Sequence, residues 1–407
     1  MKYDVIVIGA GVAGLFSALS IKNKKVLLLE KNSSAGKKLL ISGAGQCNYT
    51  NNCEMSEFIK KYGDKGRFVK AALYNFTNKD AMEFFEKHGV PSTIREDNKV
   101  FPSSFKASDI VDALVKSCSE NNAEIIFNES AEKITFDENN KMFFIKTSKN
   151  SYASEKLIIT AGGKSYSNTG STGDGYSFAR SMGHRIVEPK QALVPVYVEN
   201  YKFKDLSGIS FENIKITLWR NNKKINEFNG DLLFTHVNIS GPVILNNSRY
   251  IEKGDILKIN FTQFSNSEEF KKYFEDTISG SGKLNVKTVL KQFDIPKRFI
   301  DKIMELSGVD DSTICSQLDK NSRKKLIEII SNYALKVEKL GDFNIAMVTK
   351  GGVSTDQINS KTMESKIVPN LYFAGEVIDY DGDTGGFNIQ AAFSTGKMAA
   401  DSINKIK

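Results

Sequence analysis

The sequence predicts an α/β fold in which one sheet-and-helix domain is interrupted by an all-β module and a helical module. Three observations support this prediction. Residues 4–8, 12–22 and 26–29 form an apolar run, a stretch with apolar residues at helical spacing and a second apolar run, the pattern of a β-α-β unit. The middle of the chain changes to alternating, β-branched segments. LYFAGEV and a helix from about Asn388 then return to the first pattern.

The elements expected between the first β-α-β unit and the last helix show where the two modules are inserted. Residues 56–119 are charged and helical in pattern, strand-like runs follow at 123–127 and 141–147, and KLIITAGG is a buried strand that ends in glycines. The pattern alternates from Leu193 to about Thr262 and is helical from 268 to 333, with residues 280–282 as a linker. We therefore expect three parts: a discontinuous dinucleotide-binding domain (1–192 and 342–407), an inserted β module (193–265 and 334–341) and an inserted helical module (266–333).

The composition is that of a globular protein with a large core. The chain has 407 residues, of which 40% are hydrophobic and 26% charged, so two or three domains are expected. Its longest apolar runs fall far short of the roughly 20 residues of a membrane span, and no charged leader precedes them. Four cysteines and three histidines indicate neither a disulfide framework nor a metal site. We expect a cytoplasmic protein with no membrane attachment and no metal.

The sequence GAGVAG is the strongest local motif. Gly9, Gly11 and Gly14 directly follow a strand and open a helix, and Glu30 ends the second strand 19 residues after Gly11. In a Rossmann-like fold Gly9 makes the tight turn, Gly11 lets the backbone approach a pyrophosphate, and Gly14 permits close helix packing. The helix N-terminus faces the phosphate charge, and Glu30 accepts hydrogen bonds from ribose hydroxyls. The alternative is a glycine turn in an unrelated α/β domain, and the motif alone does not separate FAD from NAD.

Two further glycine-rich segments favour FAD. TAGG at 160–163 and YFAGEV at 372–377 both read as strands that end beside small residues, and two such strands closing on one cofactor suit FAD. Gly385 and Gly386 immediately precede the helix near Asn388, so its positive end is expected to face the flavin N1 and C2 carbonyl region and to stabilise the anionic reduced flavin. The alternative is a glycine loop that caps an ordinary helix.

Nearly the whole chain resembles the bacterial FAD-binding family that includes aminoacetone oxidase and bile-acid dienone reductase, and to which a ribosomal RNA dihydrouridine synthase is related. The resemblance is carried by GAGVAG, GKKLLISGAGQCNYTN, GSTGDGY, LFTHVNISGP and the segment from TMESK to FSTG. It implies a glutathione-reductase-like FAD domain with an inserted β-barrel-like module and a helical module. The family pattern SGGGRCN differs here at Ala44 and Gln46, a departure that bears on the substrate.

The motifs and the resemblance together give the candidate residues for FAD. They lie in the glycine turn and after the second strand, in the 36–51 motif, after the strand of TAGG, and around the final glycine loop: Gly9, Ala10, Gly11, Ala13, Gly14, Glu30, Lys31, Lys38, Ser42, Gly43, Gly45, Asn48, Ala131, Ala161, Gly162, Gly375, Glu376, Gly385, Gly386, Phe387, Asn388 and Ile389.

Cys47 and His236 are the candidate catalytic residues. A thiol beside a flavin can donate a proton during alkene reduction or act as a redox partner. Five residues separate Cys47 from Cys53, which does not match the C-x4-C redox pair of glutathione reductases. The alternative for Cys47 is packing within the cofactor loop. Thr235 and His236 are candidates to line a substrate cavity between the modules, with a structural turn as the equally supported alternative.

The expected chemistry is flavin-dependent reduction. The chain has no second GxGxxG unit, so NAD(P)H is expected to dock transiently, reduce FAD, and allow hydride transfer from flavin N5 to an electron-poor C=C bond. Candidate acceptors are uridine in ribosomal RNA, or a small molecule in an enone reductase or amine oxidase. A flavin-binding or RNA-binding protein without enzymatic activity is the alternative class.

Charge gives limited support to an RNA partner. The net charge of +8 favours anionic partners, although it also suits solubility and the phosphates of a bound dinucleotide. Lys283, Lys287 and Lys291 are expected on one face of a helix, either as a solvated surface or as a contact with nucleic acid. The oligomeric state is left open.

Overall fold

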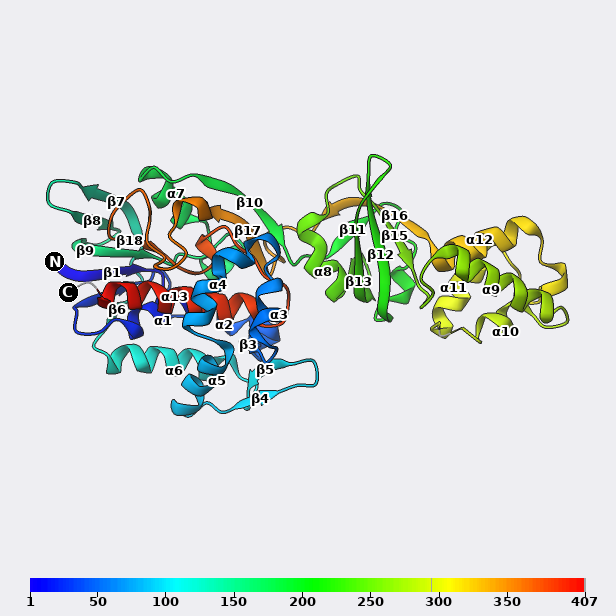
Figure 1. Cartoon of the computed structure of the whole chain (residues 1–407), viewed down its shortest axis with the longest axis horizontal. Helices are drawn as coiled ribbons and strands as arrows, with labels where there is room; N and C mark the ends of the chain where they lie inside the picture. The colour runs from blue at the N-terminus through cyan, green and yellow to red at the C-terminus, as the bar shows by residue number, and fades with distance from the viewer. Residues whose placement is uncertain (294, 406–407) are drawn as a thin grey trace. The chain divides into compact units, whose positions relative to one another are not determined.

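The computed structural model describes residues 1–293 and 295–405, and the chain divides into two compact units. The first unit contains Met1–Ala192 and Phe343–Lys407, and the second contains Leu193–Asp342. Both ends of the colour scale in Figure 1 therefore fall in the first unit, while the second unit comes from one continuous segment.

A seven-stranded sheet forms the centre of the first unit. Its order is β6 (Glu124–Ile126), β2 (Val26–Leu29), β1 (Lys2–Ile8), β9 (Ser151–Ile159), β8 (Met142–Thr147) and β7 (Ala131–Asp137), and β18 (Leu371–Phe373) also pairs with β9. The strands β6, β2, β1, β9 and β18 are parallel, whereas β8 and β7 join antiparallel. The carboxyl ends of the parallel strands meet at one edge, where open α/β sheets bind ligands.

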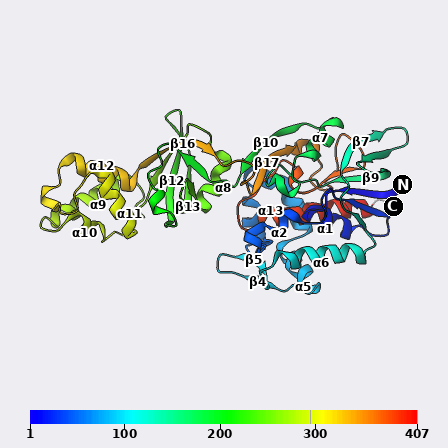
Figure 2. The same ribbon diagram turned by 180° about the vertical axis from the view of Figure 1, so that it is seen from behind.

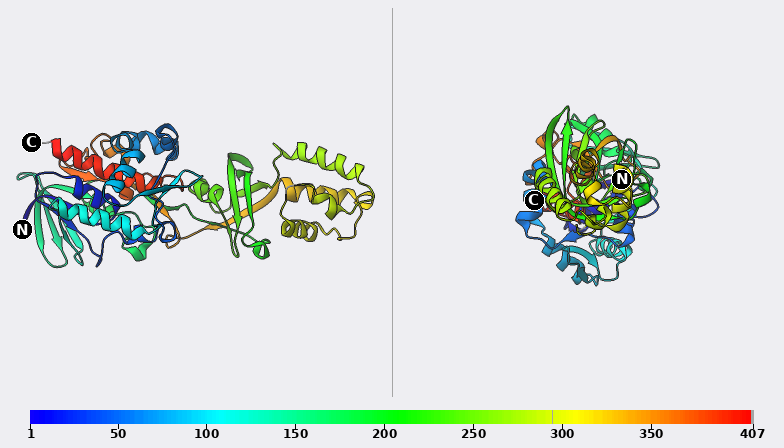
Figure 3. Two further views of the ribbon diagram at one scale, coloured as in Figure 1. Left: turned by 90° about the horizontal axis from the view of Figure 1, so that it is seen from below. Right: turned by 90° about the vertical axis from the view of Figure 1, so that its right-hand side faces the viewer.

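The helix α1 (Val12–Ser20) lies between α13 (Phe387–Lys405) and α6 (Ala107–Glu120) in Figures 1 and 3. A Cβ on Gly396 of α13 would lie only 2.6 Å from the carbonyl oxygen of Ala13 in α1, so a glycine permits this close approach. The Ser17 hydroxyl is 3.2 Å from the Gly396 carbonyl oxygen, and the Cys118 thiol of α6 donates to the Leu15 carbonyl at 3.4 Å. These contacts fix the helix that follows the glycine turn.

The segment predicted to be helical, 56–119, also contains a β-hairpin. The strands β4 (Ser92–Ile94) and β5 (Lys99–Pro102) form a small sheet with β3 (Thr50–Asn51). Each strand has only three or four residues. The alternating pattern of a strand could therefore not be recognised in the sequence between the longer helices. The strand β7 was not predicted either. The other elements of this unit are α2 (Lys37–Leu40), α3 (Met55–Lys60), α4 (Gly66–Asn75), α5 (Asn78–Lys87), α7 (Asp174–Ser181), β10 (Ile186–Ala192) and β17 (Val348–Val353).

The second unit contains a closed barrel and a group of helices. The barrel order is β11 (Val196–Val198), β14 (Ile239–Ser240), β13 (Lys223–Phe234), β12 (Ser210–Arg220), β15 (Ile256–Asn260) and β16 (Tyr333–Leu340), with α8 (Pro242–Asn247) after β14. The helices are α9 (Ser267–Gly280), α10 (Val286–Leu290), α11 (Lys297–Ser307) and α12 (Lys320–Ser331), and Figure 2 shows them from behind.

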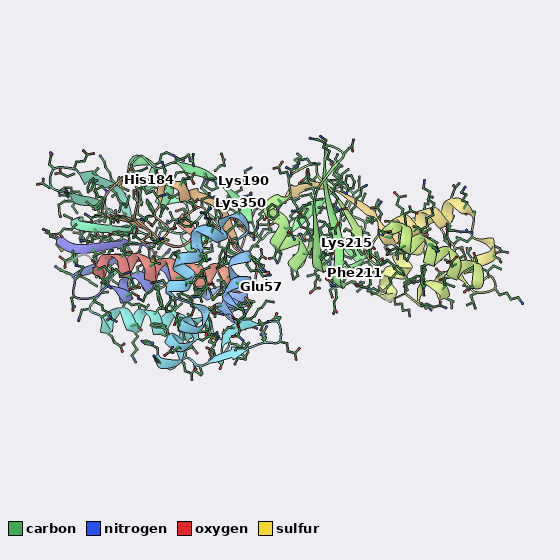
Figure 4. The ribbon with its side chains drawn as sticks, viewed as in Figure 1. Glu57, His184, Lys190, Phe211, Lys215 and Lys350 are labelled. Atoms are coloured by element: carbon green, nitrogen blue, oxygen red, sulfur yellow. The ribbon has the colours of Figure 1, made fainter. Side chains whose placement is uncertain are left out.

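One aromatic core joins the barrel to these helices. The ring of Phe299 in α11 lies 4.9 Å from that of Phe211 in β12 and 4.6 Å from that of Phe261. Phe211 is labelled in Figure 4 among the barrel strands. All three side chains are buried. The barrel and the helices share this core. The division of this unit into a separate β module and a separate helical module therefore stays a prediction.

The expected lysine stripe is not formed. The helix α10 spans only five residues, with Lys283 before it and Lys291 at its C-cap, so the three lysines do not share one helix face. The prediction was wrong because Asn285 is extended and starts a new helix after Lys283. Lys287 is also held by two carboxylates, at 2.8 Å from Asp301 and in a short contact with Asp311. Its charge is thus already paired.

No helix within residues 1–293 and 295–405 is long and apolar enough to cross a membrane. Over the same ranges, no group of three or more His, Cys, Asp or Glu residues is placed to hold a metal ion.

Candidate functional site

The turn between β1 and α1 has the geometry that the glycine motif predicts. Gly9 has φ +101°, and its amide donates to the Leu29 carbonyl at 2.8 Å. A Cβ on Gly14 would lie 1.9 Å from the Gly9 carbonyl oxygen, so the protein's own packing requires glycine there. A Cβ on Gly11 would meet no atom within 4 Å. The space beside Gly11, at the N-terminus of α1, therefore fits a pyrophosphate.

Glu30 lies directly beside this turn. Its side chain is 7% exposed, and its Oε2 accepts a 2.7 Å hydrogen bond from the amide of Ala10. Its Oε1 accepts from the backbone amide and the side-chain amide of Asn32 at 2.8 and 2.7 Å. These donors hold the carboxylate at the end of β2, where a ribose lies in dinucleotide-binding folds. Lys31, by contrast, pairs with Asp174 at 2.6 Å.

The small residues after β9 and β18 lie next to the glycine turn. Thr160 donates from its hydroxyl to the Ile8 and Gly9 carbonyls at 2.8 and 2.9 Å, which ties the start of the Ala161–Gly162 segment to the turn. A Cβ on Gly375 would lie 2.7 Å from the Cβ of Ala13 in α1. The ends of β1, β9 and β18 thus converge on the start of α1. Ala131 is the first residue of β7.

A half-buried ion pair connects α2, β17 and the segments that follow β9 and β18 at this edge of the sheet. Lys38 lies 2.5 Å from Glu376, with side chains 27% and 21% exposed. The hydroxyl of Ser165 donates to Glu376 at 2.8 Å, as does the backbone amide of Thr349. The sequence indicated Lys38 and Glu376 but not Ser165 or Thr349. Ser165 follows TAGG closely enough to have been included, whereas Thr349 lies on β17 in no motif.

The loop that carries Ser42, Gly43, Gly45, Cys47 and Asn48 has an unusual backbone. Four of its residues have positive φ, at +56° for Gly43, +55° for Ala44, +86° for Gly45 and +60° for Cys47. This conformation is unfavourable for alanine and cysteine, and such strain persists where the surroundings impose it. The Oδ1 atom of Asn48 is buried without a hydrogen-bond partner among the described residues. An unpaired buried acceptor is unusual in a protein and fits a site that binds a polar group.

Cys47 is fully buried, and burial raises the pKa of its thiol to about 12. The thiol therefore keeps its proton at neutral pH. Cys47 and Cys53 are both free, and burial also raises the pKa of Cys53. This environment suits the packing interpretation of Cys47, and a role as proton donor stays a prediction.

The N-terminus of α13 is built against β3. Gly385 and Gly386 have φ of +119° and +92°, and a Cβ on Gly386 would lie 2.4 Å from the Thr50 carbonyl oxygen. Asn51 donates from its side chain to the Gly385 carbonyl at 3.1 Å. Because α13 is 19 residues long, its free N-terminal amides present a positive end at this point.

The first turn of α13 is fixed from the other side as well. The Tyr62 hydroxyl donates to the Phe387 carbonyl at 2.7 Å. The side chain of Asn388 accepts from the Gly382 amide at 2.8 Å, so it holds the preceding loop in place. Ile389 is partly buried against the core. The helix begins at Phe387, one residue before the expected start.

The histidines have different surroundings. His236 is exposed and lies in the second unit, in a turn in which the Thr235 hydroxyl accepts from the Asn238 amide at 3.0 Å. Every candidate for FAD lies in the first unit. His184, labelled in Figure 4, is buried and bonds through Nε2 to Ser365 at 2.8 Å, and burial lowers its pKa. The bonding of His184 is structural, and a catalytic role for His236 stays a prediction.

The fold and this arrangement define an FAD-dependent oxidoreductase with a Rossmann-like domain. The sequence model described as HI0933-like protein Rossmann domain matches residues 3–402, and the chain belongs to this family. The α/β fold, the family and the flavoprotein class predicted from the sequence are confirmed.

Comparison with individual proteins gives the same class. The chain is 30% identical to an Escherichia coli K12 protein named ribosomal RNA dihydrouridine synthase, over 99% of this chain and 98% of that relative. It is 27% identical to a Clostridium scindens 3-dehydro-bile acid delta(4,6)-reductase, over 97% of each chain. A 3-ketosteroid delta1-dehydrogenase from Sterolibacterium denitrificans shares the fold, with a TM-score of 0.55 at 12% identity over 100% of both chains.

Proposed function

We propose that this protein uses FAD and NAD(P)H to reduce an electron-poor C=C bond, and that the acceptor is uridine in ribosomal RNA. The observation that carries the flavin part is the open space at Gly11 beside a packed Gly14. The acceptor is supported by the full-length similarity to the Escherichia coli relative named for dihydrouridine formation in ribosomal RNA.

The chain's own residues divide the binding of FAD between two helix ends. The amides at the N-terminus of α1 would hold the pyrophosphate, and Glu30 the ribose. The N-terminus of α13 would lie at the flavin ring and favour negative charge there. When bound, FAD supplies the capacity to accept a hydride from a nicotinamide and to pass it to the acceptor.

Residues of the 36–51 motif would orient the reacting groups. The Lys38 ammonium is held in a fixed position at the sheet edge by Glu376 and Ser165, and Glu376 pairs its charge. Asn48 offers an unpaired acceptor to the bound cofactor. The carbon next to the one that receives the hydride would take its proton from solvent water or from a side chain, for which the protonated Cys47 thiol is the candidate.

The test uses unmodified ribosomal RNA and purified FAD-loaded protein. Incubation with NADPH or NADH should produce dihydrouridine, detected by mass spectrometry of digested nucleosides. Ribosomal RNA from cells that lack the protein should gain dihydrouridine in this reaction. Ribosomal RNA from wild-type cells should gain none, because its target uridine is already reduced. Oxidation of NAD(P)H without dihydrouridine in either RNA would refute uridine as the acceptor.

A small-molecule enone is the second candidate acceptor, favoured by the similarity to the bile-acid reductase over 97% of the chain. Reduction of a steroid dienone in the same assay, with unchanged RNA, would select it. Consumption of oxygen with a small amine as donor would select the oxidase alternative. A yellow protein whose flavin is bleached by none of these donors would support a binding protein instead.

A further inference from the structure

Arg95 lies at the tip of the β4–β5 hairpin and is held on two sides. Its guanidinium carbon is 4.1 Å from the centre of the Phe101 ring and 5.2 Å from that of Phe105. Its Nη2 donates a 2.8 Å hydrogen bond to Oε1 of Gln46. The side chain is exposed, yet these three contacts fix its plane and direction.

The hairpin joins Arg95 to the candidate flavin site. The strand β5 pairs with β3, in which Asn51 holds the loop before α13. The Phe101 ring, on which Arg95 stacks, has an edge atom 3.8 Å from the position of a Cβ on Gly43. Gln46 belongs to the same loop as Gly43 and Cys47. Arg95 thus packs against the loop that contains Gly43, Gln46 and Cys47.

No carboxylate pairs directly with Arg95 within residues 1–293 and 295–405, although its positive charge, together with Lys99, helps to lower the pKa of Asp97. Asp97 in the same hairpin is paired with Lys99 at 2.6 Å. Gln46 is neutral and engages one of the five N–H donors of the guanidinium. The remaining donors are available to an anion from solution.

Exposed apolar side chains lie on the segments around this cation. Ile41 is 45% exposed, Ile94 is 48% exposed, and Phe105 is 37% exposed. A fixed arginine among exposed apolar groups suits a ligand that carries both a flat ring and an anion, as a nucleotide does.

We propose that Arg95 binds a phosphate group of a nucleotide that reaches the flavin. The proposal rests on the proposed function for the presence of such a nucleotide, which is either the phosphodiester of an RNA acceptor or a phosphate of the nicotinamide dinucleotide. A planar guanidinium fixed on aromatic rings donates two parallel hydrogen bonds to one phosphate. Gln46 orients the guanidinium and is a positioning residue.

The test compares Arg95→Ala, Arg95→Lys and Gln46→Ala in the FAD-loaded protein. Arg67→Ala is the matched control, since Arg67 is also an exposed arginine of the first unit. One arm measures the Kd of a uridine-containing single-stranded oligoribonucleotide at several salt concentrations. The other measures the NADPH and NADH dependence of flavin reduction by stopped flow. Flavin content and melting temperature verify the fold of each variant.

Arg95→Ala should weaken binding about tenfold or more in one arm. In the RNA arm, the dependence on salt should also fall by about one phosphate contact. Arg95→Lys should recover only part of the loss, because an ammonium lacks the two-pronged geometry. Gln46→Ala should show a smaller loss, and Arg67→Ala none. Loss in the RNA arm assigns the phosphate to the acceptor, and loss in the nicotinamide arm assigns it to the reductant.

Unchanged values for Arg95→Ala in both arms, or equal losses for Arg67→Ala, would overturn the proposal. Both arms measure binding or flavin reduction and neither requires product. An absence of dihydrouridine therefore counts against the proposed function and leaves the result for Arg95 intact.

Discussion

Each unit has its own apolar core, and the two differ in what fixes their loops. In the second unit, buried aromatic rings of the barrel and of α11 form one continuous core, and its ion pairs range from the exposed pair of Lys336 with Glu199 to the pair of Arg220 with the buried Asp255. In the first unit, half-buried ion pairs and glycine contacts fix the loops at the edge of the sheet, as in Lys38 with Glu376. Apolar packing thus stabilises both units, and in the first unit polar and backbone contacts also shape the candidate site.

Removal of a central ring should give the largest effect on stability. Phe299→Ala should lower the free energy of unfolding of the second unit by about 3–5 kcal/mol, because it leaves a cavity among buried rings. FAD affinity should be unchanged, since every candidate FAD residue lies in the first unit. Calorimetry and flavin titration of the same sample measure both. An equal loss of FAD affinity would break the distinction between the units.

The glycines of the turn provide a matched pair. Gly14→Ala should destabilise the first unit by about 1–3 kcal/mol or more, because its Cβ would overlap the Gly9 carbonyl. Gly11→Val should lower the stability of the FAD-free protein by no more than about 1 kcal/mol, the cost of replacing glycine at the N-cap of α1, since its φ of −77° and ψ of −175° are open to valine. The purified Gly11→Val protein should be colourless, because the valine side chain would occupy the space in which the pyrophosphate of FAD is expected. A yellow, fully loaded Gly11→Val protein would refute the assignment of the turn.

Glu30 should affect the cofactor more than the fold. Glu30→Ala should weaken FAD binding by about 1.5–3 kcal/mol through the loss of charge-assisted hydrogen bonds. Glu30→Gln should lose less, because it keeps one acceptor. Fluorescence titration of FAD into flavin-stripped protein measures the difference. Equal affinity in wild type and Glu30→Ala would show that Glu30 does not hold the ribose.

The smallest effect is expected from Cys47 and depends on pH. Burial raises the pKa of this thiol to about 12, against about 9 in the unfolded chain. The unfolded state therefore loses its proton first, and stability contributed by the neutral thiol is present below pH 9 and falls as the pH rises toward 12.

The slope reaches at most about 1.4 kcal/mol per pH unit for one thiol. Denaturant unfolding between pH 8 and 10.5 should therefore show a shallower decline for Cys47→Ala than for wild type. Cys118→Ala is the comparison, because burial raises its pKa to about 12 as well, away from the 42–48 loop. Identical slopes in wild type and both variants would contradict the buried, protonated state.

The parts of the site that the sequence predicted are those fixed by local pattern. The turn at Gly9 and Gly14 follows from a strand, a helix and a close approach within a few residues. Thr349 was missed because it lies on β17 and reaches Glu376 only through the tertiary fold, for which the local sequence has no pattern. The prediction of a lysine stripe was wrong because it relied on local spacing alone. Spacing by four residues implies one helix face only where the helix continues, and Asn285 interrupts it.

The packing of α1 against α13 has a consequence for synthesis on the ribosome. The strand β18 and the helix α13 complete the sheet and the flavin edge of the first unit, yet they follow the second unit in the sequence. The continuous second unit can fold as soon as it leaves the exit tunnel, while β9 waits for β18 and α1 waits for α13, both of which are made after the second unit. The cofactor site is thus the last part of the chain to form, and free FAD is available to stabilise it only from that moment.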